Sequence, residues 1–154
     1  MNQNNPDIFI NNDYKFLIPK NIETVVKSTI NYLLSPEEVA VAVTFVDEEQ
    51  MIELNTQYSG YAQVTDVLSF ESHEIDPETG LIFLGDIIIC YPYVEVQSNK
   101  LGNNLNNEIL LMVIHGLLHL SGFNHDNNES KAKMWDTQNS ILESLHIKIN
   151  KLPE

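Results

Sequence analysis

The chain has 154 residues, 43% of them hydrophobic, which is enough for one globular domain with its own core. Its formal net charge of −14 comes from 22 acidic residues against eight basic ones, all lysines, and this excludes the broad basic surface typical of nucleic-acid-binding proteins. A single cysteine, Cys90, excludes an intramolecular disulfide.

The start of the chain is polar and lacks both the basic residues and the apolar stretch of a signal peptide. No apolar run approaches the ~20 residues that a helix needs to cross a bilayer. We therefore expect a cytoplasmic protein with no membrane partner.

The first half of the chain alternates short apolar runs with one amphipathic pattern. The expected elements, in chain order, are strand pieces at residues 8–10 and 16–18, a helix over residues 21–34 and a β-branched strand over residues 39–46. Asp47 and Gln50 then have the spacing of a capping box, which predicts a helix from Asp47 to about Tyr58.

The second half predicts a hairpin followed by three helices. The expected elements are strands over residues 66–70 and 81–90, with a turn at 76–80, and helices over residues 91–100, 107–120 and 128–145. Pro92 suits the first turn of its helix. About four strands and four or five helices in mixed order, without a repeat or a linker, predict one α+β domain over residues 1–154 with a mixed sheet.

Three of the five histidines, His115, His119 and His125, fall within eleven positions. On a helix the rings of His115 and His119 project from one face, one turn apart. Gly122 can adopt the left-handed conformation that ends a helix, and the chain would then return His125 to the same point. Three imidazoles with an open fourth position are typical of a catalytic zinc site.

Histidines four residues apart on a helix also arise by chance, as surface or core residues. Here the surrounding segment is apolar nearly all round, as in a buried helix, and an unsatisfied buried polar group costs roughly 1–3 kcal/mol. A metal would provide partners for both rings, so the pattern favours a metal site.

The three histidines and Gly122 have the offsets of the metzincin peptidase pattern HExxHxxGxxH. Gly116, however, stands where those peptidases carry the glutamate that acts as general base. A metallopeptidase-like hydrolase of small substrates is therefore an alternative that Gly116 disfavours.

The run from His115 to Asp126 resembles the signature of the bacterial YbeY family of endoribonucleases and rRNA maturation factors. Residues 55–58 with 65–70 are similar to the upstream motif of that family, and residues 84–90 to its central strand. The resemblance implies a compact α+β hydrolase domain with one Zn²⁺ held by His115, His119 and His125. It also implies a single-strand-specific metallo-endoribonuclease that processes the 3′ end of small-subunit rRNA and acts in ribosome quality control. Its partners would be rRNA, the small ribosomal subunit and assembly proteins, and not DNA.

The chain departs from that family at Ser59, where members carry an arginine regarded as functionally important. No arginine occurs elsewhere, and a lysine lacks the bidentate fork of a guanidinium. Ser59 is therefore a candidate catalytic position at which phosphate handling is altered. A non-catalytic ribosome assembly factor with a structural zinc is a further alternative, favoured by Ser59 and by the acidic charge.

The remaining candidates each have two interpretations. Asp66 and Asp86 could accept hydrogen bonds from the second nitrogens of the ligating histidines, or cap turns. Asp126 could orient a histidine or the metal-bound water, or cap the last helix. Lysines near the histidines in sequence could contact the phosphates of a substrate; these are Lys100, Lys131 and Lys133.

Overall fold

The centre of the molecule is a four-stranded sheet with the strand order β1-β2-β4-β3. The computed structural model describes residues 5–33, 38–60 and 62–153, and its strands are β1, Asp7–Asn11; β2, Val39–Val46; β3, Val67–Ile75; and β4, Ile82–Cys90. β1, β2 and β4 run parallel, whereas β3 pairs antiparallel with β4. This mixed sheet confirms the expected α+β fold.

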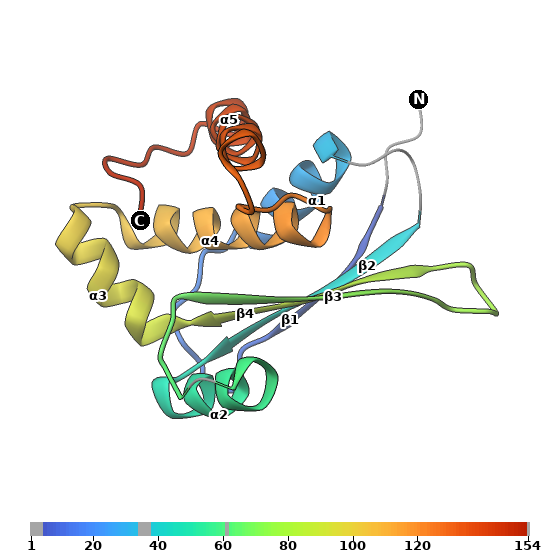
Figure 1. The fold of residues 1–154 in the computed structure, drawn as a ribbon, viewed down its shortest axis with the longest axis horizontal. Helices are drawn as coiled ribbons and strands as arrows, with labels where there is room; N and C mark the ends of the chain where they lie inside the picture. The colour runs from blue at the N-terminus through green and yellow to red at the C-terminus, as the bar shows by residue number, and fades with distance from the viewer. Residues whose placement is uncertain (1–4, 34–37, 61, 154) are drawn as a thin grey trace.

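Helices cover both faces of the sheet, in unequal layers (Figure 1). In the described part of the chain they are α1, Ile22–Leu33; α2, Glu48–Ser59; α3, Tyr91–Leu101; α4, Leu105–Leu120; and α5, Asn128–Ser144. α1, α4 and α5 lie on one side of the sheet, and α2 lies alone on the other. α3 follows directly from β4 and leads into α4.

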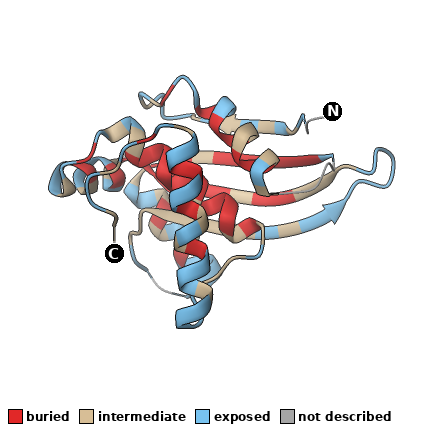
Figure 2. Cartoon of the chain, turned by 90° about the horizontal axis from the view of Figure 1, so that it is seen from above, coloured by how far each residue is buried: buried red, intermediate tan, exposed pale blue. Residues whose placement is uncertain are grey.

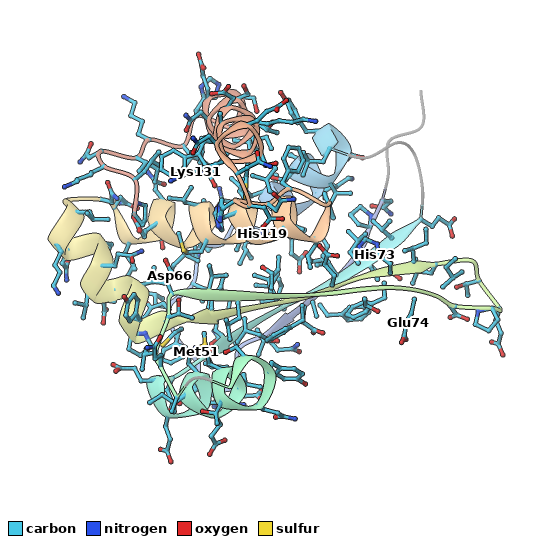
Figure 3. The ribbon with its side chains drawn as sticks, in the orientation of Figure 1. Met51, Asp66, His73, Glu74, His119 and Lys131 are labelled. Carbon is cyan, nitrogen blue, oxygen red and sulfur yellow. The ribbon has the colours of Figure 1, made fainter. Side chains whose placement is uncertain are left out.

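β2 is buried on both of its faces because helices cover each of them. Its residues Val41, Val43 and Phe45 join the large core beneath α4, whereas Val46 joins a small cluster with Met51 of α2. Figure 3 shows Met51 between α2 and the sheet. Burial on both faces explains why this strand is a continuous apolar run instead of an alternating one.

α4 is the central helix, and it contacts α1, α3, α5, β3 and β4. Its buried surface forms the middle of the molecule in Figure 2. Gly116 permits a close approach to the sheet, because an ideal Cβ on this residue would lie 2.8–3.0 Å from side-chain atoms of Ile87 on β4. The helix begins after Asn104, whose side chain accepts a hydrogen bond from the backbone of Asn107.

The strand piece expected at residues 16–18 is wrong. The side chain of Asn12 bonds both backbone polar groups of Phe16, at 3.0 Å to its N–H and 2.8 Å to its carbonyl. Since these groups are already paired, no neighbouring strand is needed. The Phe16 ring instead stacks on Tyr91, with the ring centroids 4.5 Å apart.

The capping box expected at Asp47 forms only in part. The Asp47 side chain accepts from the backbone N–H of Gln50, as predicted, at 2.9 Å. The side chain of Gln50 instead accepts a hydrogen bond from the hydroxyl of Tyr14, at 2.8 Å. The first helix ends among the described residues at Leu33, and its expected last residue, Leu34, lies outside them.

β3 continues to Ile75, five residues beyond its expected end at Phe70, and forms with β4 a hairpin that extends past the helices (Figure 1). Four of the five added residues are polar and the fifth, Ile75, is exposed, so they lack the apolar pattern of a covered strand. The turn expected at residues 76–80 is confirmed, because the N–H of Gly80 donates to the carbonyl of Asp76 at 2.8 Å.

A bulge interrupts this hairpin where β3 faces Gly85. The strand register shifts between Glu71 and Glu74, and His73 within the bulge has φ of 58°. Gly85 has φ of +143°, and an ideal Cβ there would lie 2.0 Å from the carbonyl oxygen of Phe70. The hairpin therefore requires a glycine at this position.

Candidate metal centre

The three histidines expected to converge do so. His115 and His119 lie one turn apart on α4, and their ring centroids are 4.7 Å apart. After Ser121, Gly122 adopts φ of +99° and turns the chain back, which brings the ring of His125 to 5.3 Å from His115 and 4.9 Å from His119. One possible ligand nitrogen of each histidine lies within 4.8 Å of the other two.

The outer nitrogens of two rings are held by acceptors. His115 Nδ1 donates to the side-chain oxygen of Gln138 on α5 at 2.9 Å, and His119 Nδ1 donates to the carbonyl of Phe123 at 3.1 Å. Because both partners accept, each Nδ1 carries the proton of its neutral ring. Each Nε2 therefore presents a lone pair.

These two lone pairs face each other, since His115 Nε2 and His119 Nε2 are 3.1 Å apart. Neither can donate to the other while both protons are on Nδ1. A cation between them would turn this repulsion into coordination. Two nitrogen ligands of a tetrahedral zinc, at bonds of roughly 2.0–2.1 Å, lie roughly 3.3 Å apart, so the spacing fits a shared ion.

Burial lowers the pKa of both helix histidines. The pKa of His119 falls from 6.5 to about 4, first because of burial and then because of the neighbouring His115 and His125. Burial also lowers the pKa of His115, against the opposing effect of the hydrogen bond that its ring donates to Gln138. Both rings are neutral near pH 7, and this is the form that binds a metal.

These shifts predict a pH dependence of the metal-free protein. The unfolded chain binds a proton on His119 below its ordinary pKa of 6.5, whereas the folded protein binds it only near its folded pKa of about 4. The free energy of unfolding should therefore fall as the pH is lowered from 6.5 towards 4, and this contribution should level off below that. Urea unfolding after chelation, compared with the non-titrating variant His119→Asn, isolates the effect. An equal slope of the unfolding free energy against pH in both proteins would contradict this prediction.

The histidines are reached from two sides. A cavity of about 290 Å³ opens beside His115 and His125, and its wall includes Asp66, Trp135, Gln138, Leu152 and Pro153. The other histidine cavity runs along β3 to His115 and His119 and includes Ser69 and Glu71. Trp135 is half-buried and lines the first cavity.

The two aspartates do not hold the histidine rings. The Asp66 carboxylate accepts from the backbone N–H of Val67 at 2.8 Å and from the Gln97 amide at 3.4 Å, although it lines both histidine cavities. Figure 3 shows Asp66 at the start of β3, on the α4 side of the sheet. Asp86 precedes Ile87, which packs against α4, so strand alternation turns Asp86 to the opposite face. Burial raises the pKa of Asp86.

The other two candidate catalytic residues, Asp126 and Ser59, make no hydrogen bond to the histidine rings. Asp126 is exposed beside His125 and does not cap α5, because the side chain of Asn127 accepts from the backbone N–H of Ser130 at 2.8 Å. Ser59 ends α2 on the other face of the sheet, donates to the carbonyl of Asn55 at 2.7 Å, and lines neither histidine cavity.

The candidate lysines divide into two groups. Lys131, labelled in Figure 3, lies with its ammonium 5.3 Å from the ring centroid of Trp135, which lines the first histidine cavity. Lys133 lies 5.9 Å from the ring centroid of Phe123, whose carbonyl accepts from His119. Lys100 lines a different cavity, beside α3.

Gln138 is the residue that the sequence pattern did not single out. It is 5% exposed and shares the buried stripe of α5 with Met134, Ile141 and Leu142. A lone amide in an apolar helical stripe needs a buried partner, and this is the signal that could have identified it.

Across the described ranges, every helix is too short or too polar to cross a membrane.

Known proteins match most of the chain. Residues 8–146 match the family model described as endoribonuclease YbeY. The chain is 36% identical over 151 residues to the endoribonuclease YbeY of Shouchella clausii, covering 90% of this chain and 94% of that one. It is 37% identical over 134 residues to that of Sulfurihydrogenibium sp., covering 85% and 82%. The solution structure of TM1509 from Thermotoga maritima superposes with a TM-score of 0.59 at 26% identity, covering 92% and 91%.

Proposed function

This chain belongs to the YbeY endoribonuclease family, and from that premise we propose that it is a metal-dependent endoribonuclease that cuts single-stranded RNA. The observation that carries the proposal is the pair of facing lone pairs on His115 and His119, beside His125 and an open cavity. We further propose that the substrate is the 3′ end of small-subunit rRNA, within ribosome maturation and quality control in the cytoplasm.

The three histidines would hold one ion, and zinc suits three neutral imidazoles with an open position. When bound, such an ion lowers the pKa of water and offsets negative charge on a phosphoryl oxygen. Gln138 and the carbonyl of Phe123 fix the two helix rings in the tautomer that leaves Nε2 free.

Exposed groups around the histidines would handle the substrate. Asp126 follows His125 and would accept a proton or orient water at the mouth of the site. Lys131 and Lys133, on α5 beside Trp135 and Phe123, would contact phosphates of the bound strand. The aromatic ring of Trp135 offers a stacking surface for a base.

The packing of Gly116 speaks against peptide hydrolysis. The position where metzincins carry their glutamate faces Ile87 of β4, with no room for a Cβ. A carboxylate placed there would meet the sheet before it reached the histidines. Peptidase chemistry would therefore need a base from another part of the chain.

Cleavage of single-stranded RNA by the purified zinc-loaded protein tests the proposal. We expect cleavage of a single-stranded RNA, little cleavage of the same sequence as a duplex, and none of a peptide library. His119→Ala should abolish cleavage, whereas His146→Ala, which removes an exposed histidine outside the triad, should not. Binding without cleavage would favour a non-catalytic assembly factor, and peptide cleavage lost in His119→Ala would favour a peptidase.

Because members of the family carry an arginine at this position, Ser59→Arg is expected to raise RNA cleavage by about tenfold or more, through a phosphate contact outside the two histidine cavities. A charged hydrogen bond to a phosphate contributes roughly 1.5–3 kcal/mol, and each 1.36 kcal/mol is about tenfold in rate. The exposed C-terminal end of α2 tolerates a cation, which also suits the helix dipole. Steady-state kinetics should show the gain mainly at low substrate concentration, with unchanged metal content. Ser59→Gln, which has length without charge, is the control, and an equal gain there would contradict a phosphate contact.

A further inference from the structure

A cavity outside the metal centre, the second cavity, lies beside the histidine cavity of about 290 Å³. It has a volume of about 430 Å³, within the range of small-ligand sites, and its lining combines an aromatic ring, two ammonium groups and one amide: Tyr93, Lys100, Lys151 and Gln97. One carboxylate, that of Glu48, also lines it. None of the histidines belongs to this cavity.

The two cavities share a wall. Leu152 and Pro153 line both of them. Gln97 lines the second cavity and donates to Asp66, which lines the first, at 3.4 Å. A ligand that passes over Leu152 and Pro153 would therefore contact both cavities.

The shared wall is held in place by hydrogen bonds. Asn103, at the junction of α3 and α4, is 9% exposed; its amide donates to the carbonyl of Lys151 at 2.8 Å. Its side-chain oxygen accepts from the backbone N–H groups of Asn150 at 2.7 Å and Lys151 at 3.1 Å. The Asn107 amide also donates to the carbonyl of Lys148, at 3.1 Å. The segment that carries Lys151 is thus fixed against α4.

The two ammonium groups are available for a ligand. Over residues 5–33, 38–60 and 62–153, the single ion pair joins His73 and Glu71, so neither Lys100 nor Lys151 is paired despite the charge of −14. Both lysines are exposed, and Tyr93 is 39% exposed. Unpaired lysines next to an accessible aromatic ring are the groups that bind a phosphate and stack a base.

We propose that this second cavity binds a nucleotide of the same RNA strand, next to the nucleotide at the histidines. The inference rests on the proposed function and adds the path of the substrate. Lys100 and Lys151 contact phosphates, Tyr93 stacks a base, and Leu152 and Pro153 lie under the strand between the two cavities. Glu48 favours a base edge with amino groups over a further phosphate on its side.

Binding of RNA probes of two lengths tests this path. The zinc-loaded protein is titrated with fluorescent 2′-O-methyl oligoribonucleotides, a dinucleotide and one of about eight nucleotides, which matches the shorter site sizes of single-strand binders. Fluorescence anisotropy gives the affinity, and gels confirm that the probe stays intact. Lys100→Ala with Lys151→Ala should weaken binding of the longer probe about tenfold or more and leave the dinucleotide unchanged. The salt slope for the longer probe should fall by about 1.4, the value for two lost phosphate contacts.

The matched control removes the same charge elsewhere. Lys20 and Lys148 are exposed and line neither cavity, so Lys20→Ala with Lys148→Ala should leave both affinities near those of the unmodified protein. Tyr93→Ala should weaken the longer probe, whereas Tyr93→Phe should not.

The outcomes separate the two proposals. Unchanged affinity in the Lys100 and Lys151 variant, or an equal loss in the control pair, would overturn the second subsite alone. An unmodified protein that binds neither probe would overturn the proposed function together with it.

Discussion

His119→Ala is expected to reduce the metal content of the protein from about one ion per chain to a small fraction of that. The substitution removes one of three nitrogen donors and leaves the lone pair of His115 Nε2 without the neighbour that lies 3.1 Å away. A site with two imidazoles on an open surface holds zinc far less tightly than one with three. Elemental analysis after dialysis against metal-free buffer gives the ratio directly.

The same measurement on other variants defines the site. His115→Ala and His125→Ala should also lose the metal, and the exposed His146→Ala should keep it. Gln138→Ala keeps all three ligands but removes the acceptor of His115 Nδ1, so its affinity should fall by about 10–100-fold. Full metal content in any two of the three alanine variants of the triad would show that these histidines do not form the site.

Gly85→Ala is expected to lower the free energy of unfolding by about 4 kcal/mol or more, a large part of the roughly 5–15 kcal/mol of a typical domain. A Cβ at this position would lie 2.0 Å from the carbonyl oxygen of Phe70 and 3.0 Å from Leu120. The first atom belongs to the backbone of β3, so relief requires the strand to move. Urea unfolding followed by circular dichroism measures the loss.

Gly80→Ala separates this collision from the cost of the backbone conformation alone. Gly80 also has a positive φ, +75°, but no atom lies within 4 Å of its ideal Cβ. Its replacement should therefore cost only roughly 1–2 kcal/mol, the ordinary penalty of a left-handed conformation. Similar losses in the two variants would mean that the backbone conformation, and not the contact with Phe70, sets the requirement for glycine.

The elements that depend on residues close together in the chain could be predicted from the sequence. The β-branched run of β2 predicts a strand and the apolar run of α4 predicts a helix, because hydrophobic periodicity and secondary-structure propensity depend on neighbouring residues. The triad could also be predicted, since an i, i+4 pair followed by a glycine turn fixes three side chains through one helix end. Gly122 supplies that turn with φ of +99°.

The contacts that could not be predicted from the sequence join residues far apart in the chain. Gln138 reaches His115 from 23 positions away, and only the packing of α5 on α4 brings them together. Whether Asp86 faces the histidines depends on which face of β4 meets α4, which residue spacing alone does not settle. The predicted strand at residues 16–18 failed because the amide of Asn12 satisfies Phe16 in place of a partner strand.

The shared wall formed by Leu152 and Pro153 has a practical consequence for purification. Any sequence fused after this segment would emerge between the histidine cavity and its neighbour. An oligohistidine tag placed there would bring additional imidazoles to the metal centre and would add its own ions to any stoichiometry. β1 begins on the opposite side of the molecule (Figure 1), so a tag fused ahead of it would leave the native ligands without competitors.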